Sequence, residues 1–187
     1  MNRRPGDQRL RRHQLERRCR IDGDLDPQLP IEQSDDPVRA YADVLLAELD
    51  LLKANLAPGI RLSRLHWGGG TPTFLSHDEM RQLMATTRKH FRLIEDGEYS
   101  IEVDPRTVTR ERLAVLKEVG FNRLSFGVQD FDPDVQKAVH REQPAEQVFQ
   151  LMEEARKIGF DSVNVDLIYG LPRQTPESFE RTLAQVC

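Results

Sequence analysis

The feature that most constrains this chain is a run of three glycines, Gly68-Gly69-Gly70, between an apolar segment and a Thr-Pro turn. The stretch reads LHWGGGTPTFL over residues 65–75. Because glycine lacks a Cβ atom, its backbone can adopt positive φ and a ligand can approach it closely. A glycine triplet alone is compatible both with a tight turn after a strand and with a ligand-binding loop. Downstream, the sequence repeats one order of elements: a strand, a polar residue at the end of that strand, and then a helix. This repetition favours a ligand-binding loop over a simple tight turn.

Strand and helix signals alternate along residues 37–187. Strands are predicted at 60–67, 99–103, 121–128 and 160–168, and helices are predicted to begin at Pro37, Ser76, Thr109, Pro144 and near Pro176. The first helix carries an apolar repeat that predicts one buried face, formed by Tyr41, Leu45, Leu49 and Leu52. Strands that alternate with helices predict parallel strands joined by right-handed crossovers. The expected fold class is therefore α/β, a partial (β/α) barrel of about four βα units, with its chemistry at the carboxyl ends of the strands.

Residues 1–36 differ in composition from the rest of the chain. Residues 1–20 carry eight arginines against two acids, and residues 21–36 carry six acids and no basic residue. Blocks of one charge with few apolar residues cannot bury enough surface to fold. We expect a disordered segment, or one foreign to the rest and read in a wrong frame, followed by the ordered part at 37–187. A nucleic-acid arm or a transit peptide is disfavoured, because residues 1–20 lack serine and an apolar helical face.

Composition and charge exclude several classes of protein. A chain of 187 residues with 38% apolar and 31% charged residues is ordinary for a globular domain with a sizeable core. The net charge of −4 gives no general attraction to nucleic acid or anionic membranes. No apolar run approaches the roughly 18 residues that span a bilayer. Two cysteines, Cys19 and Cys187, are too few for a disulfide framework, so we expect a cytoplasmic protein without nucleic-acid or membrane partners.

Polar residues stand at the ends of the later predicted strands, as the glycines do at the first: Glu102, Gln129 and Asp166. Each alone has a structural interpretation, since Glu102 could cap a loop and Asp166 could form a salt bridge. Four such groups at four successive strand ends are harder to explain in that way, because a buried carboxylate needs a partner. Arg141 could bind a carboxylate of the protein or of a ligand, or it could be a solvated arginine beside a helix.

Five motifs, HWGGGTPT, SIEVDP, GFNRLSFGVQDF, HREQ and NVDLIYGLPRQTPESF, occur in the order of one known family. Over about residues 38–186 they resemble the core of the oxygen-independent coproporphyrinogen III oxidases (coproporphyrinogen dehydrogenases), which are radical S-adenosylmethionine (SAM) enzymes. The related haem-chaperone branch shares the glycine motif but tends to carry an EANP-like segment where this chain has residues 102–105. The resemblance implies a partial barrel of the radical SAM type, in a family whose members are monomers with an open (β/α)6 barrel.

The resemblance also implies a reaction and a set of binding residues. The family converts coproporphyrinogen III to protoporphyrinogen IX in anaerobic haem biosynthesis, and two propionate carboxylates leave as CO2. A [4Fe-4S] cluster reductively cleaves SAM, and the resulting 5′-deoxyadenosyl radical abstracts a propionate hydrogen. Two SAM molecules bind side by side. By resemblance, the first is contacted by Gly69 and Glu102 and the second is lined by Gly70, Thr71, Gln129, Arg141 and Asp166, with the arginine facing a methionyl carboxylate.

This chain departs from the family at two places. The family usually has asparagine where this chain has His140, beside the retained arginine. More importantly, the family binds its cluster through three thiolates of a CxxxCxxC loop upstream of the helix at Pro37, whereas the corresponding region here, residues 18–24, contains Cys19 alone. We therefore expect no metal-ligating or catalytic residue in this chain, which also ends after four βα units. It is expected to be a fragment of the oxidase that is inactive alone.

The sequence leaves two other interpretations open. A cluster-less, haem-chaperone-like module could bind SAM or a tetrapyrrole without catalysis, and a decayed fragment would have no function. Each of the three possibilities leaves strand edges and apolar side chains of an open half barrel uncovered. We therefore expect weak stability and a tendency to aggregate.

Overall fold

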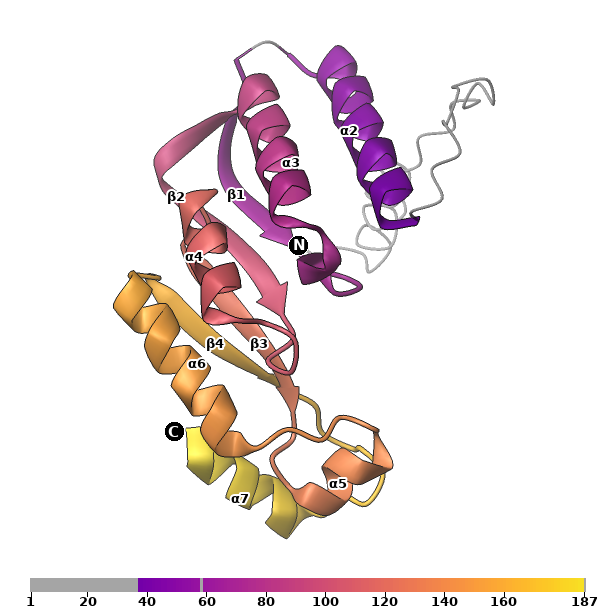
Figure 1. The fold of residues 1–187 in the computed structure, drawn as a ribbon, viewed down its shortest axis with the longest axis vertical. Coiled ribbons are helices and arrows are strands. Elements are labelled where there is room, and N and C mark those ends of the chain that lie inside the picture. The colour runs from indigo at the N-terminus through magenta and orange to yellow at the C-terminus, as the bar shows by residue number, and fades with distance from the viewer. Residues whose placement is uncertain (1–36, 58, 187) are drawn as a thin grey trace, which may run out of the picture. The chain divides into compact units, whose positions relative to one another are not determined.

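The computed structural model describes residues 37–57 and 59–186, which lie in one compact unit, Gln33–Cys187 (Figure 1). The segment 1–36, predicted to be disordered or foreign, lies outside the described residues. In chain order the elements are α2 (Pro37–Asn55), β1 (Arg61–Trp67), the 3-10 helix η2 (Pro72–Phe74), α3 (His77–His90), β2 (Arg92–Val103), α4 (Arg110–Glu118), β3 (Arg123–Gln129), α5 (Pro133–Ala138), α6 (Ala145–Ile158), β4 (Ser162–Leu167) and α7 (Pro176–Val186). None of the described helices is both long and apolar enough to cross a membrane.

The four strands form one sheet in the order β1-β2-β3-β4, and every neighbouring pair is parallel. The prediction of parallel strands separated by helices is confirmed. Strand β2 is longer than the predicted 99–103, because Arg92, Leu93 and Glu98 also pair with β1, on the two sides of an irregularity between Leu62 and Arg64. The sequence did not predict this part of the strand, because its segment RLIEDGE contains glycine and acidic residues, which are depleted in strands.

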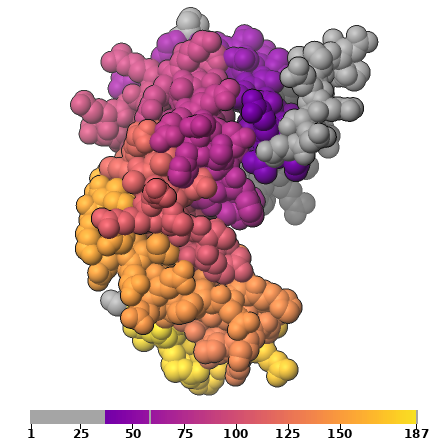
Figure 2. All heavy atoms as spheres, in the orientation of Figure 1, coloured from indigo at the N-terminus to yellow at the C-terminus, as the bar shows by residue number. Residues whose placement is uncertain are grey.

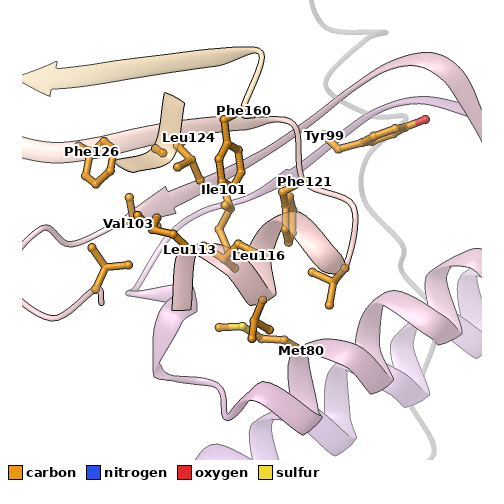
Figure 3. Close-up of a cluster of buried hydrophobic side chains, with 14 of the residues drawn as sticks. Met80, Tyr99, Ile101, Val103, Leu113, Leu116, Phe121, Leu124, Phe126 and Phe160 are labelled. Atoms are coloured by element: carbon orange, nitrogen blue, oxygen red, sulfur yellow. The ribbon is translucent and has the colours of Figure 1, made fainter. Parts of the chain in front are cut away.

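The two faces of the sheet differ in chemistry. Successive side chains of a strand point to opposite faces. On one face the side chains of Ile101, Leu124, Phe126 and Val128 are fully buried. They belong to a core shared with Met80 of α3, the α4 residues Leu113 and Leu116, and Phe121 and Phe160, most of which are labelled in Figure 3. The alternate positions carry Ser100, Glu102, Ser125, Gln129 and Asp166, so the polar residues at the strand ends share the opposite face.

Local capping signals are confirmed. The Ser76 hydroxyl accepts a hydrogen bond from the Glu79 amide at 3.2 Å, and the Glu79 carboxylate accepts one from the Ser76 amide at 2.7 Å. This is a capping box at the start of α3. The Thr109 hydroxyl accepts from the amide of Arg112 at 3.2 Å and caps α4. Gly159 follows α6 with φ of 99°, a left-handed conformation that glycine adopts freely.

The prediction for the apolar face of α2 is wrong in part. Leu45 and Leu49 are partly buried against the core, but Tyr41 is 61% exposed and Leu52 is 38% exposed. Helix α2 packs against α3, and Figure 2 shows the two side by side at the surface. The apolar repeat instead lines a pocket of about 660 Å³ between α2, β1 and α3, so no element covers that face among the described residues.

Candidate functional site

The three glycines after β1 serve three different purposes. A Cβ atom on Gly68 would lie 2.4 Å from Nε2 of His66 and 2.7 Å from Oε1 of Glu102, so any side chain here would force these two side chains to move. Gly69 has φ of 100°, and its amide donates to Oε2 of Glu102 at 3.3 Å. A Cβ on Gly70 would meet no atom within 4 Å, so the space beside it is open. This open backbone fits a ligand that approaches the turn closely.

Glu102 lies on the polar face at the end of β2 and is bound from both sides. Its Oε1 lies 3.2 Å from Nε2 of His66, and its Oε2 accepts the Gly69 amide. Nδ1 of the same histidine lies 2.8 Å from the Ser100 hydroxyl. Sequence reasoning identified Glu102 and Gly69 but missed His66 and Ser100. Strand alternation could have found Ser100, which lies two residues before Glu102 and therefore on the same face.

A bulge sets the position of Gln129 at the end of β3. The β3–β4 register pairs Gly127 with Asp166 and then Gln129 with Leu167, so Val128 is an extra residue on β3. Gln129 has φ of 74°, and its carbonyl accepts from the amide of Ile168 at 2.9 Å. Bulges and left-handed residues other than glycine are frequent beside functional sites, where they redirect a side chain.

Arg141 and Asp166 lie near the same stretch of β3. Nη2 of Arg141 donates to the carbonyl of Gly127 at 3.0 Å. Asp166, paired in register with Gly127, accepts from the Ser125 hydroxyl at 2.7 Å. The structure thus brings Gln129, Arg141 and Asp166 together around Gly127 and joins Gly69 to Glu102 on the neighbouring strand.

Gly70 and Thr71 lie in the turn that leads into η2 and line the apolar pocket beside α2. The Thr71 carbonyl accepts from the amide of Phe74 at 2.9 Å, which closes the turn. In this described turn, the Thr71 side chain makes no capping hydrogen bond to η2. Of the predicted site residues, these two are therefore placed by the turn itself and not by contacts with the strand ends.

Asp104, the residue after β2, was not among the predicted site residues, and sequence reasoning missed its role. Asp104 is 8% exposed and lies 2.6 Å from Nη2 of Arg106 and 3.3 Å from Nη2 of Arg141. Burial alone would raise the pKa of the Asp104 carboxyl, but hydrogen bonds from Arg106 and the charges of both arginines hold that pKa below its usual range. The sequence signal that could have indicated this role is the acid Asp104 followed two residues later by Arg106.

The backbone conformation at His140 accounts for the residue types that this position accepts. Its φ of 54° lies in the left-handed region. Asparagine and histidine are both enriched in that region among residues other than glycine. The resemblance implies asparagine at this position, and histidine shares its tolerance of the left-handed backbone that precedes Arg141.

The residues of the family's cluster are not found in this part of the chain. The described residues contain no cysteine, and no group of three or more histidine, cysteine or acidic side chains among them could hold a metal ion. The two cysteines of the sequence, Cys19 and Cys187, lie outside the described residues. The donor set of the described residues does not fit an iron-sulfur cluster bound by three thiolates.

Comparison with known proteins gives consistent matches. A family model described as the radical SAM superfamily matches residues 32–186. The oxygen-independent coproporphyrinogen III oxidase of Paracoccus denitrificans is 51% identical over 156 residues, which are 81% of this chain and 35% of that protein. The Escherichia coli oxidase is 52% identical over 146 residues, 78% of this chain and 32% of that protein.

A solved structure agrees with these matches. The structure of the Escherichia coli coproporphyrinogen III oxidase, described as a radical SAM enzyme, matches with a TM-score of 0.74 and 50% identity over 80% of this chain and 34% of that chain. This match confirms the α/β fold of a partial radical SAM barrel. The chain spans about a third of the length of these relatives. From the family match over residues 32–186, the chain belongs to the radical SAM superfamily.

Proposed function

We propose that this chain corresponds to the SAM-binding part of an oxygen-independent coproporphyrinogen III oxidase. The complete enzyme would convert coproporphyrinogen III to protoporphyrinogen IX by oxidative decarboxylation in anaerobic haem biosynthesis. The observation that carries this proposal is about 50% identity to oxidases of two organisms, sustained over 146 and 156 residues. These relatives are oxidases, which favours this function over a haem-chaperone-like module or a functionless fragment. We further propose a cytoplasmic monomer with no nucleic-acid or membrane partner.

The geometry supports two SAM positions, as the family resemblance implies. At the first, Gly69 would offer close backbone approach, and Glu102 would accept hydrogen bonds from hydroxyl or ammonium groups. At the second, Arg141 would bind the methionyl carboxylate, while Gly70, Thr71, Gln129 and Asp166 would line the remainder. SAM supplies the 5′-deoxyadenosyl group of the reaction. The open space beside Gly70 and the partly exposed carboxylate of Glu102 and guanidinium of Arg141 fit such a polar ligand.

The [4Fe-4S] cluster of the family does not fit the described residues, because they contain no cysteine. The sequence holds two cysteines where the family uses three thiolates. We therefore propose that this polypeptide alone binds SAM and does not turn over coproporphyrinogen III.

Isothermal titration calorimetry of the 187-residue chain with SAM tests the binding proposal. We expect saturable binding that Glu102→Gln weakens. Glu153→Gln, the same change at an exposed carboxylate near Lys157 on α6, should leave the affinity unchanged. Absence of binding by the unaltered chain, or equal affinities for both variants, would refute this site.

Anaerobic iron-sulfur reconstitution tests the proposal about catalysis. After gel filtration, iron and sulfide counts should fall well below four of each per chain. A full four-iron cluster on every chain would show that thiolates are supplied in another way and that this polypeptide is not restricted to binding.

A further inference from the structure

The carboxylate of Asp104 is enclosed by two arginines at the end of β2. Nε of Arg106 lies 3.0 Å from Oδ1 and 3.2 Å from Oδ2, and the Arg106 amide also donates to Oδ1 at 3.0 Å. Arg141 approaches from the segment after α5, with its Nη2 3.3 Å from Oδ2. Both oxygens of this nearly buried acid are therefore occupied by partners within the protein. Asp104 is thus suited to orienting other groups and not to binding a ligand directly.

The guanidinium of Arg141 is fixed along one side only. Its Nη2 is shared between Asp104 and the carbonyl of Gly127. Among the described residues, Nε of Arg141 is buried without an acceptor, while 29% of the side chain remains exposed. An arginine has five N–H donors, and a buried donor without a partner is unfavourable. The buried Nε is closed to an incoming ligand, but the exposed part of the Arg141 side chain leaves room for a further anionic acceptor.

Arg106 completes the arrangement in two ways. Its Nη1 donates to the carbonyl of His140 at 3.3 Å, so the Asp104–Arg106 pair also anchors the left-handed residue that precedes Arg141. Its charge also offsets that of Asp104. With one acid and two arginines the cluster keeps a net positive charge, whereas Asp104 and Arg141 alone would neutralise each other.

We propose that Asp104, supported by Arg106, is a positioning residue that orients Arg141 toward the methionyl carboxylate of SAM. This inference rests on the proposed function, because it takes SAM as the ligand of Arg141. In this proposal the two residues have different roles. Arg141 contacts the ligand, and Asp104 sets the angle and place of its guanidinium without touching the ligand.

The test compares two ligands, of which only one carries the methionyl carboxylate. SAM has the aminocarboxypropyl group that bears this carboxylate, whereas 5′-methylthioadenosine shares the adenosine and the methylated sulfur but lacks the whole group and the sulfonium charge. Titration calorimetry on the full chain should show that Asp104→Asn weakens SAM binding about tenfold, because an oriented charge contact is lost. The affinity for 5′-methylthioadenosine should change less than about twofold, since that ligand does not use Arg141. A general structural defect would weaken both ligands alike.

Two further variants keep the test decisive if Asp104→Asn folds poorly. Arg106→Gln changes a partly exposed side chain and should also weaken SAM selectively. Glu98→Gln is the matched control, because Glu98 is another β2 carboxylate bound by two arginines, Arg64 at 3.3 Å and Arg123 at 3.0 Å. It should leave both affinities unchanged, and circular dichroism melts should report the folding of each variant.

Arg141→Gln separates failure of the inference from failure of the proposed function. If this variant weakens SAM selectively but Asp104→Asn and Arg106→Gln do not, Asp104 has no positioning role and the proposed function stands. If Arg141→Gln has no effect on SAM, or the unaltered chain does not bind SAM, then Arg141 is not a SAM ligand. The proposed second site and the inference then fall together.

Discussion

The carboxylate of Glu102 occupies the space that a side chain at position 68 would need, since a Cβ on Gly68 would lie 2.7 Å from its Oε1. The space at the glycine and the position of the acid therefore depend on each other, although Gly68 follows β1 and Glu102 lies on β2. Two residues further on, a Cβ on Gly70 would meet nothing within 4 Å. The turn thus contains one glycine whose neighbouring space is filled by His66 and Glu102 and one whose neighbouring space is free for a ligand.

Alanine at Gly68 should affect the stability of the fold, whereas alanine at Gly70 should affect SAM binding. Gly68→Ala should lower the free energy of unfolding, because the new methyl group must displace His66 or Glu102. Gly70→Ala should change that free energy by less than about 0.5 kcal/mol, since no contact is altered. It should nevertheless weaken SAM binding, because the methyl group fills the open space. Urea unfolding and titration calorimetry on both variants check this, and unchanged SAM affinity in Gly70→Ala would leave the turn with a structural role alone.

Helix α7 is tied to the end of β3 through Asp130, which is 1% exposed. Its carboxylate accepts hydrogen bonds from the Thr182 hydroxyl and from Gln174. Thr182→Val keeps the shape but removes the donor and should destabilise the fold by about 1–3 kcal/mol, because a buried acceptor loses its partner. Thr182→Ser retains the hydroxyl and should lose clearly less. An unchanged stability of Thr182→Val in urea unfolding, with a clear loss in Thr182→Ser, would show that the methyl group of Thr182 matters and the hydrogen bond does not.

The capping box at Ser76 gives a prediction independent of any ligand. Ser76→Ala removes the acceptor for the Glu79 amide and should lower the free energy of unfolding by about 1 kcal/mol. Ser76→Asp is the control, because aspartate is also a favourable N-cap and should restore most of the loss. Thermal or urea unfolding measures both, and a neutral Ser76→Ala would mean that α3 is stabilised by its packing through Met80 and Met84 alone.

The sequence signals that predicted the fold were local and strong. The predicted helix starts at Ser76 and Thr109 and the apolar runs predicted as strands were confirmed. The signals failed where a residue's environment depends on distant parts of the chain. The apolar repeat of α2 predicted a buried face, but no described element covers Tyr41, and no local pattern reports what lies opposite a helix.

In the candidate site, too, residues marked by local sequence signals could be predicted and those that depend on distant contacts could not. Glu102, Gln129 and Asp166 could be identified because each ends a predicted strand, and the alternation of β-strands puts them on one face. The bulge that gives Gln129 its positive φ could not be predicted, since it arises from the pairing of β3 with β4. Asp104 was also missed, because its importance lies in a contact with Arg141, 37 positions later in the sequence. A carboxylate beside proline reads locally as a turn signal.

Two buried acids should make the fold sensitive to low pH. Burial acts to raise the pKa values of Asp104 and Asp130, but hydrogen bonds and nearby arginines around Asp104, and hydrogen bonds around Asp130, hold both below the ordinary 3.8. A pKa that is lower in the folded state stabilises the fold fully above the unfolded value, and this contribution is lost as the pH falls through the folded value. The free energy of unfolding should therefore decline as the pH is lowered from about 5 toward 3.

Substitution of either acid separates this contribution from general acid unfolding. Asp130→Asn and Asp104→Asn should each be less stable than the unaltered chain at pH 7, and the difference should shrink in acid because an amide does not titrate. Urea unfolding at pH 7, 5, 4 and 3 measures the slopes. Ser76→Ala, which lowers the stability without removing a titratable group, is the control and should keep the acid slope of the unaltered chain. If the two aspartate variants also keep that slope, the acid sensitivity must come from other groups, and the hydrogen bonds around Asp104 and Asp130 would not favour their charged forms in the folded state.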